Sequence, residues 1–412
     1  MRSIIFFTIY VSFALCKDYS NYKVFEIMPT RQQLDSLMKW EFEAGIDFWS
    51  TGEANKPSRV MVSPEIEQLF LQFLNLNDIQ HKMTIENVEL VLENDKIARL
   101  NSRAKRNTFI EPNFRLYWSY NEIENFLQRL ANEYPDLVKK DVIGQSIEHR
   151  NIHGVRVSRN AEFGKNPIIF IDAGTHAREW AGIHSALYFL HQLVENSTVT
   201  NELLDKVDYV FVPVVNPDGY AYSFTEDRLW RKNRRYVNYT CQGIDLNRNY
   251  AYMWRYRENS CAGTGYPGAY ALSEPETQAM AAYMQSFKYN FKLYLSTHTY
   301  GSLVLWPFGF EFIYVKNHKE HHLMGEKFRD AIYEATGTLY RVGNSADILY
   351  TANGASDDFA LAYANANFAY TLELPGGGSA GFDYPQSMIY DLVRETFIGY
   401  RQFGLHIKER FN

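Results

Sequence analysis

Several common features are missing from this sequence of 412 residues. No long basic run occurs, and 48 acidic residues outnumber 42 basic ones, for a formal net charge of −6. Polyanion-binding proteins usually have the opposite balance, so we expect no nucleic-acid partner. Internal repeats and extended low-complexity segments are absent as well. The length then favours two or more domains, or one large domain with an appendage.

Long apolar runs are also missing, with one partial exception at the N-terminus. The first residues, MRSIIFFTIYVSFALC, place an arginine before an apolar run. This layout is typical of a secretory signal peptide, and we predict residues 1–16 as a signal that is cut after Cys16. A short membrane anchor or buried helix is the alternative, but the run is too short to span a bilayer comfortably. We therefore expect a secreted protein with no membrane association.

Cysteine is scarce, because the whole chain has only three. Export would remove Cys16 with the signal and leave Cys241 and Cys261 as an even pair in an oxidising compartment. We therefore predict a disulfide between Cys241 and Cys261. Two free thiols are the alternative.

Residues 17–106 are predicted to form a small α+β domain with an antiparallel sheet. Helical patterns include an amphipathic helix after Pro64, whose apolar face contains Leu69 and Phe70. Strand-like runs occur at 22–28, 46–49, 59–62 and 81–88. A polar stretch at 101–107 then places three basic side chains between Arg103 and Arg106. We interpret it as an exposed linker open to trypsin-like proteases; a solvated, charged helix end is the alternative.

Residues 107–412 are predicted to form a larger α/β domain, with a mixed, mainly parallel sheet sandwiched by helices. Strand-like runs alternate with helical patterns, and the strands are expected at 168–173, 209–215, 294–297 and 369–374. In such sheets, ligands bind beyond the carboxyl ends of strands. Three of these ends carry ionisable groups, in IDAGTHAREW (171–180), LSTHTY (295–300) and TLELP (371–375).

These strand ends contain candidate metal ligands. His176 and Glu179 can meet at one ion if the turn into the following helix is tight, and His298 is available from a distant strand. Two histidines and one glutamate leave the fourth position of Zn²⁺ open for water. The ion lowers the pKa of that water towards ~7. The H-x-x-E pattern alone is common, and a surface pair at a helix start is its simpler interpretation.

Arginines are concentrated near the same inferred rim. Arg178 lies between the first two candidate ligands, and LWRKNRR (229–235) and DLNRN (245–249) contain more. Arginine recognises carboxylates through two parallel hydrogen bonds. This concentration favours a site for an anionic group over ordinary surface charge.

Seven ordered motifs make the sequence resemble zinc metallocarboxypeptidase precursors of the pancreatic A/B type: THAREW, PVVNPDGY, LWRKNR, DLNRN, STHTYG, ILYTANGASDD and TLEL. The resemblance covers the chain after the signal, prosegment included. It implies a monomeric enzyme that removes the last residue from peptide and protein C-termini, with one Zn²⁺ held by His176, Glu179 and His298. It also implies an inhibitory activation domain at 17–106, freed from a catalytic domain at 107–412 by a trypsin-like protease, and digestive work in a gut lumen.

The resemblance assigns roles to further residues. Glu373 matches the general base, and Arg231 matches the group that stabilises the oxyanion. The clamp on the substrate's free carboxylate matches Asn247, Arg248 and Tyr350. Arg178 matches an auxiliary carboxylate site, and Tyr300 matches an aromatic residue of the upstream subsite.

Asp357 decides the expected specificity. It stands seven residues after Tyr350, where the family places the base of the specificity pocket, and an aspartate there accompanies preference for C-terminal Lys or Arg. An enclosed carboxylate is costly unless a cation pairs with it. We therefore predict a B-type enzyme. The alternatives are a turn or helix-cap role, or a register in which Asp358 takes the position. Ser345, where basic-specific members usually have glycine, leaves the relative use of Lys and Arg open.

Two competing functions remain. The same machinery with aromatic or aliphatic preference is one, and a catalytically silent peptide-binding relative is the other. The silent relative would need to lose a ligand or the base, yet all four residues are present: His176, Glu179, His298 and Glu373.

Overall fold

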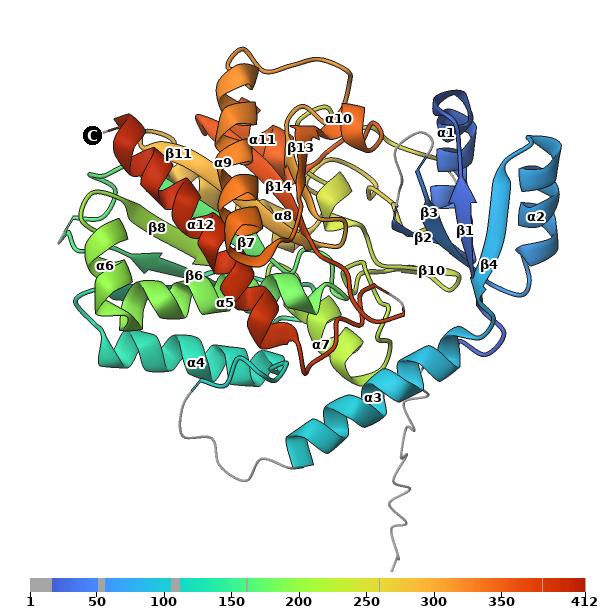
Figure 1. Ribbon diagram of the computed structural model, residues 1–412, viewed down its shortest axis with the longest axis horizontal. Helices are drawn as coiled ribbons and strands as arrows, with labels where there is room; N and C mark the ends of the chain where they lie inside the picture. The colour runs from blue at the N-terminus through green and yellow to red at the C-terminus, as the bar shows by residue number, and fades with distance from the viewer. Residues whose placement is uncertain are drawn as a thin grey trace, which may run out of the picture.

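The computed structural model describes residues 17–50, 56–104, 112–160, 162–258, 260–379 and 381–411. The predicted signal peptide lies outside the described residues, as do Lys105 and Arg106 of the predicted cleavage region. The chain forms a small N-terminal unit and a larger C-terminal unit, joined through the long helix α3 (Val88–Ala104) (Figure 1). Within the described ranges, no helix is both long and apolar enough to cross a membrane.

The small unit is a four-stranded antiparallel sheet. In sheet order its strands are β2 (Ile46–Ser50), β3 (Ser58–Val62), β1 (Lys23–Met28) and β4 (Gln80–Ile85). Its helices are α1 (Arg31–Leu37), the 3-10 helix η1 (Met38–Phe42) and α2 (Glu67–Leu76). Strand alternation sends adjacent residues to opposite faces. Phe25 shares a buried cluster with side chains of α1 and α2, whereas Val24 belongs to a cluster with Leu229 and Phe382 of the larger unit. The sheet therefore lies between its own helices and the larger unit.

Two details of the prediction for this unit are wrong. Leu69, expected on the buried face of α2, is 55% exposed, because the helix is buried along a narrow stripe through Phe70 and Leu74. The fourth strand ends at Ile85, and Val88 already belongs to α3.

The linker predicted at 101–107 is also wrong for residues 101–104, which form the last turn of α3. This turn contains no glycine or proline, and alanine and arginine favour helix. The larger unit holds Arg103, whose Nη2 atom lies 2.8 Å from Glu122 Oε2 and 2.7 Å from the carbonyl oxygen of Tyr117. The basic cluster thus begins on a docked helix.

The larger unit has an eight-stranded mixed sheet. In sheet order its strands are β13 (Arg341–Asn344), β12 (Leu303–Trp306), β14 (Phe368–Leu374), β11 (Phe291–Thr299), β7 (Ile168–Ala173), β8 (Asp208–Val212), β6 (Asn151–Val157) and β5 (Val138–Gln145). The four central strands β14, β11, β7 and β8 run parallel to one another, and β12 runs parallel to β13. The remaining pairs are antiparallel. The predicted fold class is confirmed.

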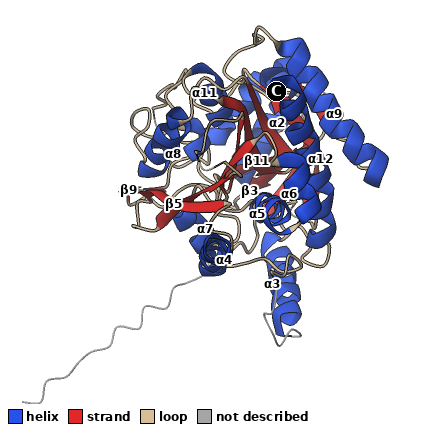
Figure 2. Cartoon of the chain, turned by 90° about the vertical axis from the view of Figure 1, so that its left-hand side faces the viewer, coloured by secondary structure: helices blue, strands red, loops and turns tan. Residues whose placement is uncertain are grey.

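Helices cover both faces of this sheet (Figure 2). One face is packed by α4 (Tyr120–Glu133), α5 (Trp180–Glu195), α9 (His318–Thr336) and α12 (Ile389–Phe411), and the other by α8 (Pro275–Ser286) and α11 (Ser356–Ala362). Strand β7 is buried along its whole length and serves both faces. Ile169 and Ile171 belong to the first cluster, whereas Ile168 and Phe170 belong to the second.

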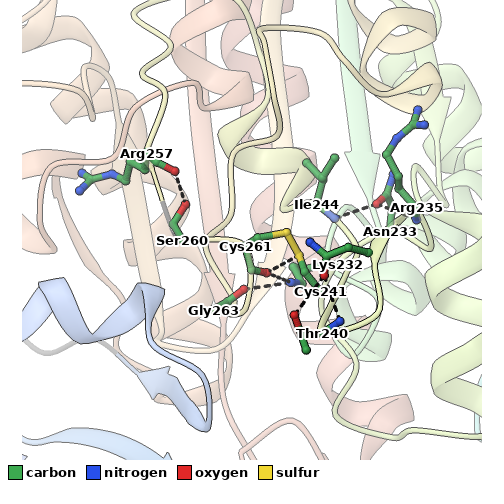
Figure 3. The surroundings of a disulfide bond; sticks show 11 residues. Lys232, Asn233, Arg235, Thr240, Cys241, Ile244, Arg257, Ser260, Cys261 and Gly263 are labelled. Atoms are coloured by element: carbon green, nitrogen blue, oxygen red, sulfur yellow. Dashed lines mark hydrogen bonds between the residues drawn. A yellow bond between two sulfur atoms is a disulfide. The ribbon is translucent and has the colours of Figure 1, made fainter.

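The predicted disulfide between Cys241 and Cys261 is present (Figure 3). It joins the hairpin of β9 (Tyr236–Asn238) and β10 (Cys241–Gln242) to a later loop. The Lys232 ammonium group donates to the carbonyl oxygens of Cys261 and Gly263, at 3.2 and 2.9 Å. A crosslink restricts the unfolded chain, and this one closes the segment that contains the DLNRN motif.

Candidate active site

Three neighbouring parallel strands carry the site. Strands β7, β11 and β14 end at one edge of the sheet, and the register pairs His298 of β11 with Glu373 of β14. His176 and Glu179 lie in the turn between β7 and α5. This turn starts at Gly174, which has a φ of 68°. Residues with a side chain rarely adopt this backbone conformation, so glycine permits the sharp turn at the end of the strand.

The three predicted ligands come together. His176 Nδ1 lies 2.8 Å from Glu179 Oε1, and His298 Nδ1 lies 2.9 Å from Glu179 Oε2. The two Nδ1 atoms are 3.1 Å apart. All three residues are at most 5% exposed. They form the one group among the described residues whose histidine, cysteine or acidic ligand atoms could hold a metal ion.

The outer contacts of the two imidazoles fit a zinc site. His176 Nε2 lies 3.2 Å from Asp245 Oδ1, and His298 Nε2 lies 3.0 Å from the hydroxyl oxygen of Ser296. A proton on each Nε2 satisfies these oxygens and leaves the Nδ1 lone pairs converging beside a carboxylate. Two imidazole nitrogens and a carboxylate oxygen are a ligand set that Zn²⁺ takes with an open position. The zinc cofactor expected from the sequence therefore fits the residues present.

Asp245 connects a ligand to the predicted oxyanion residue, and the sequence analysis assigned it no role. Its Oδ2 atom accepts from Arg231 Nε and Nη2 at 3.1 and 2.9 Å, and its Oδ1 atom also accepts from the Asn247 backbone at 2.9 Å. Burial by itself would raise the pKa of Asp245, but Arg231 and His176 outweigh it and hold the pKa well below its usual range. Its position in DLNRN was the available signal, because a metal-binding histidine commonly has an outer carboxylate.

Glu373 differs from the other acidic groups at this edge. Its Oε2 atom is shielded from solvent and has no hydrogen-bond partner within the described residues. Burial raises the pKa of Glu373 to about 7, and the charge of Glu179 adds to this rise, while His298 and Arg231 oppose it. A carboxyl group with a pKa near neutrality can accept and return a proton.

The predicted carboxylate clamp is also assembled. Arg248 Nη2 lies 2.7 Å from the Tyr350 hydroxyl oxygen. The Asn247 side-chain oxygen accepts from the Ser356 backbone at 2.9 Å, which ties the clamp to the start of α11. The neighbouring Asp357 is therefore held close to the clamp.

The adjacent residues Asp357 and Asp358 face different surroundings. Asp358 accepts from the Gly309 and Phe310 backbone N–H groups, with its shortest contact at 2.9 Å, and it does not line the cleft. Asp357 lines the cleft and accepts from the Thr371 hydroxyl at 3.1 Å. Burial raises the pKa of Asp357. This geometry matches the register in which Asp357 is the pocket residue.

One cavity of about 1000 Å³ gathers the predicted residues. All of them except His298 line it: His176, Arg178, Glu179, Arg231, Asn247, Arg248, Tyr300, Tyr350, Asp357 and Glu373. Ser345 lines it as well, with its hydroxyl 3.3 Å from the Trp306 carbonyl oxygen.

Two acidic residues of the small unit contact arginines of this cavity, and Glu41 also lines it; the sequence analysis missed both. Asp47 of β2 binds Arg178 through both carboxylate oxygens, one of them 3.0 Å from Nη2. Glu41 of η1 has its Oε1 atom 3.4 Å from Arg248 Nη2 and 3.3 Å from the Tyr350 hydroxyl. Both acids are buried. Acidic residues inside the apolar stretches WEF and IDFW were the signal, because such groups need a partner.

Comparisons with known proteins agree with this geometry. The family profile described as zinc carboxypeptidase matches residues 123–399, and that described as carboxypeptidase activation peptide matches residues 25–95. Carboxypeptidase B of Astacus astacus is 34% identical over 301 residues, which cover 72% of this chain and 98% of that protein. Zinc carboxypeptidase A 1 of Anopheles gambiae is 31% identical over 388 residues, covering 92% and 88%. The crystal structure of carboxypeptidase A from Helicoverpa armigera superimposes with a TM-score of 0.89 at 31% identity, covering 94% of this chain and 98% of that one.

The profile matches, the convergent His–Glu–His group and the acids of the small unit that meet arginines of the cleft lead to one conclusion. The chain belongs to the zinc carboxypeptidase family, as the precursor of a zinc-dependent peptide hydrolase that carries the family's activation peptide.

Proposed function

We propose that this protein is the secreted zymogen of an exopeptidase that removes C-terminal lysine or arginine. The observation that carries this specificity is the carboxylate of Asp357, which is 3% exposed and lines the cleft without a cationic partner in the described structure. A substrate ammonium or guanidinium group would neutralise it in a place where an unpaired charge is costly. Asp358 needs no such partner, because backbone N–H groups satisfy it.

The residues of the cleft have complementary roles in this proposal. Bound at His176, Glu179 and His298, a zinc ion would supply Lewis-acid activation of water and of the scissile carbonyl. Glu373 accepts the proton of the attacking water and returns it to the leaving amine. Arg231, held in place by Asp245, presents a fixed positive charge to the oxygen on which negative charge develops.

Exopeptidase action follows from the clamp. Arg248 and Tyr350, with Asn247 beside them, receive the free carboxylate of the last residue. An internal peptide bond offers no charge there and would leave buried donors unpaired, at about 1–3 kcal/mol for each group. Arg178 and Tyr300 line the same cavity and extend the substrate contacts upstream.

The small unit inhibits by occupying the same arginines. Asp47 neutralises Arg178, and Glu41 lies where a substrate carboxylate would meet Arg248. Cutting within 103–107 by a trypsin-like protease would free the unit. Because Arg103 is engaged with Glu122, we expect the first cut after Lys105 or Arg106. Released enzyme would act as a monomer outside the cell, with a gut lumen as the expected site.

A kinetic panel tests the specificity. Trypsin-treated protein is given peptides that differ only in the last residue, and kcat/KM is expected to be highest for Lys and Arg. Replacement Asp357→Ala should remove this preference, whereas Ser345→Gly should change only the ratio of Arg to Lys. If kcat/KM is highest for Phe or Leu and Asp357→Ala does not change it, the B-type assignment is wrong, although the protein is still a carboxypeptidase.

The alternative is an enzyme with aromatic or aliphatic preference. It is favoured by the A-type names of two of the relatives described above. The same panel separates the two possibilities, because A-type activity would give its highest kcat/KM with C-terminal Phe or Leu. A complete lack of hydrolysis in zinc-loaded, cleaved protein would indicate the silent relative.

A further inference from the structure

The two metal-binding histidines differ in what lies behind them. His176 meets a carboxylate directly, because Asp245 Oδ1 is 3.2 Å from its Nε2 atom. His298 meets a hydroxyl, with Ser296 Oγ at 3.0 Å from its Nε2 atom. A serine hydroxyl is a weaker acceptor than a carboxylate unless its own proton is given to an anion.

Strand geometry supplies that anion. Ser296 and His298 are two residues apart on β11, so their side chains share one face of the sheet. The register between β11 and β7 pairs Ser296 with Asp172. The Ser296 hydroxyl lies 2.7 Å from Asp172 Oδ1, and the Tyr294 hydroxyl donates to Asp172 Oδ2.

Counting protons fixes the direction of the hydrogen bonds that link His298, Ser296 and Asp172. Asp172 and Ser296 are fully buried, and His298 is 1% exposed. A hydroxyl has one proton, and Ser296 gives it to Asp172. Ser296 can therefore only accept from His298, which places a proton on Nε2 and leaves the lone pair on Nδ1, 2.9 Å from Glu179 Oε2.

We propose that Asp172 is a positioning residue for His298. It acts indirectly, through the Ser296 hydroxyl, whereas Asp245 contacts His176 directly. The chain holds the imidazole in the tautomer and orientation that zinc requires. The proposal rests on the ligand set assigned above, and it adds two residues that the sequence analysis did not single out.

Zinc affinity, measured by competition with a chromogenic chelator, tests the proposal without any substrate. We expect Ser296→Ala in the zymogen to weaken zinc binding by roughly 10–100-fold, the range for outer contacts of metal ligands. Asp172→Asn should weaken it by roughly 10-fold within that range. The double variant should bind zinc about as well as Ser296→Ala, because the hydrogen bonds that link Asp172 to His298 pass through the Ser296 hydroxyl. Ser296→Thr keeps the hydroxyl and should restore most of the affinity.

Tyr294→Phe is the matched control. It removes the other hydrogen bond to Asp172 but leaves the chain to His298 complete, so zinc affinity should stay within about threefold. Melting of the metal-free variants, followed by circular dichroism, reports any loss of packing. The proposal is overturned if Ser296→Ala binds zinc within about twofold of the parent protein, if Tyr294→Phe loses as much affinity as Ser296→Ala, or if the two single effects add. His298→Ala separates this failure from a wrong ligand set, since zinc binding unaffected by His298→Ala would refute the ligand assignment itself.

Discussion

The two units of this chain bury acidic groups against arginines in different ways. In the larger unit, Asp245 finds His176, Arg231 and the Asn247 backbone within its own fold. In the small unit, Glu41 and Asp47 meet their arginines only across the interface. The first network lies wholly within the larger unit, whereas the second needs both units in contact.

Under the proposed zymogen function, this difference would let the small unit inhibit the chain while the site of the larger unit stays assembled. A buried charge that loses its partner costs about 3–5 kcal/mol, but separation of the units returns both partners to water. The inhibitory pairs can therefore be firm in the zymogen and dispensable after cleavage. The pair of Asp245 and Arg231 lies within the larger unit, so we expect it to hold the predicted oxyanion residue in place after cleavage as well.

The largest expected effect comes from a substitution within the site of the larger unit. Glu373→Gln removes the group that accepts a proton but keeps its shape, so kcat of the cleaved enzyme should fall by roughly 10²–10⁴-fold. Zinc content, measured by elemental analysis, should stay at one ion per chain, and the small unit should dock as before. Retained full activity would contradict the assigned base.

The next effect breaks the contact between the units. Asp47→Asn leaves Arg178 buried without its counter-charge, which should weaken docking by about 3–5 kcal/mol. Hydrolysis of a short peptide by uncleaved zymogen should then rise by roughly 10²–10³-fold over its basal rate.

Glu41→Gln is the comparison for that variant. The contacts of Glu41 are longer, at 3.3 and 3.4 Å, so its loss should cost about 1 kcal/mol and raise zymogen activity by less than roughly tenfold. A larger effect from Glu41→Gln than from Asp47→Asn would reverse the ranking of the two inhibitory pairs.

Acid should also destabilise the larger unit through a buried histidine. His184 is fully buried, with Nε2 accepting from the Trp118 backbone at 2.9 Å and Nδ1 at 3.0 Å from the Trp180 carbonyl oxygen. Burial lowers the pKa of His184 from 6.5 to about 4. The unfolded chain therefore binds the extra proton first, so stability is complete above pH 6.5 and falls as the pH drops towards 4. The loss should approach about 3 kcal/mol.

The unfolding midpoint in urea, measured on cleaved enzyme at pH 7 and pH 4.5, checks this expectation. His184→Gln keeps an acceptor for the Trp118 backbone but cannot be protonated, so it should lower the stability at pH 7 and flatten the dependence on pH. The same slope in both proteins would assign the acid sensitivity to other groups.

Much of the fold could be predicted because its central elements have strong periodicity. Strand β7 was located to the residue, since an apolar run buried on both faces is bounded by polar turns. Strands β5, β6, β12 and β13 were missed. Strand β5 lies at the sheet edge, and only one residue of its sequence, VKKDVIGQ, is buried, while β12 and β13 have only four residues each. Short or edge strands take their partners from the tertiary fold, and their local pattern carries little signal.

The candidate site also has features that the sequence predicted and features that only the tertiary structure revealed. The sequence by itself predicted the ligand residues, the base and the clamp, because these residues stand in ordered motifs, and the structure brings them together at one cavity. Only the tertiary structure decided that Asp357 faces the cleft while Asp358 is satisfied by backbone N–H groups, and that Glu41 and Asp47 reach Arg248 and Arg178. Local pattern reports which face of an element is buried. The partner of a buried charge depends on how distant elements pack, and no periodicity within one segment encodes that.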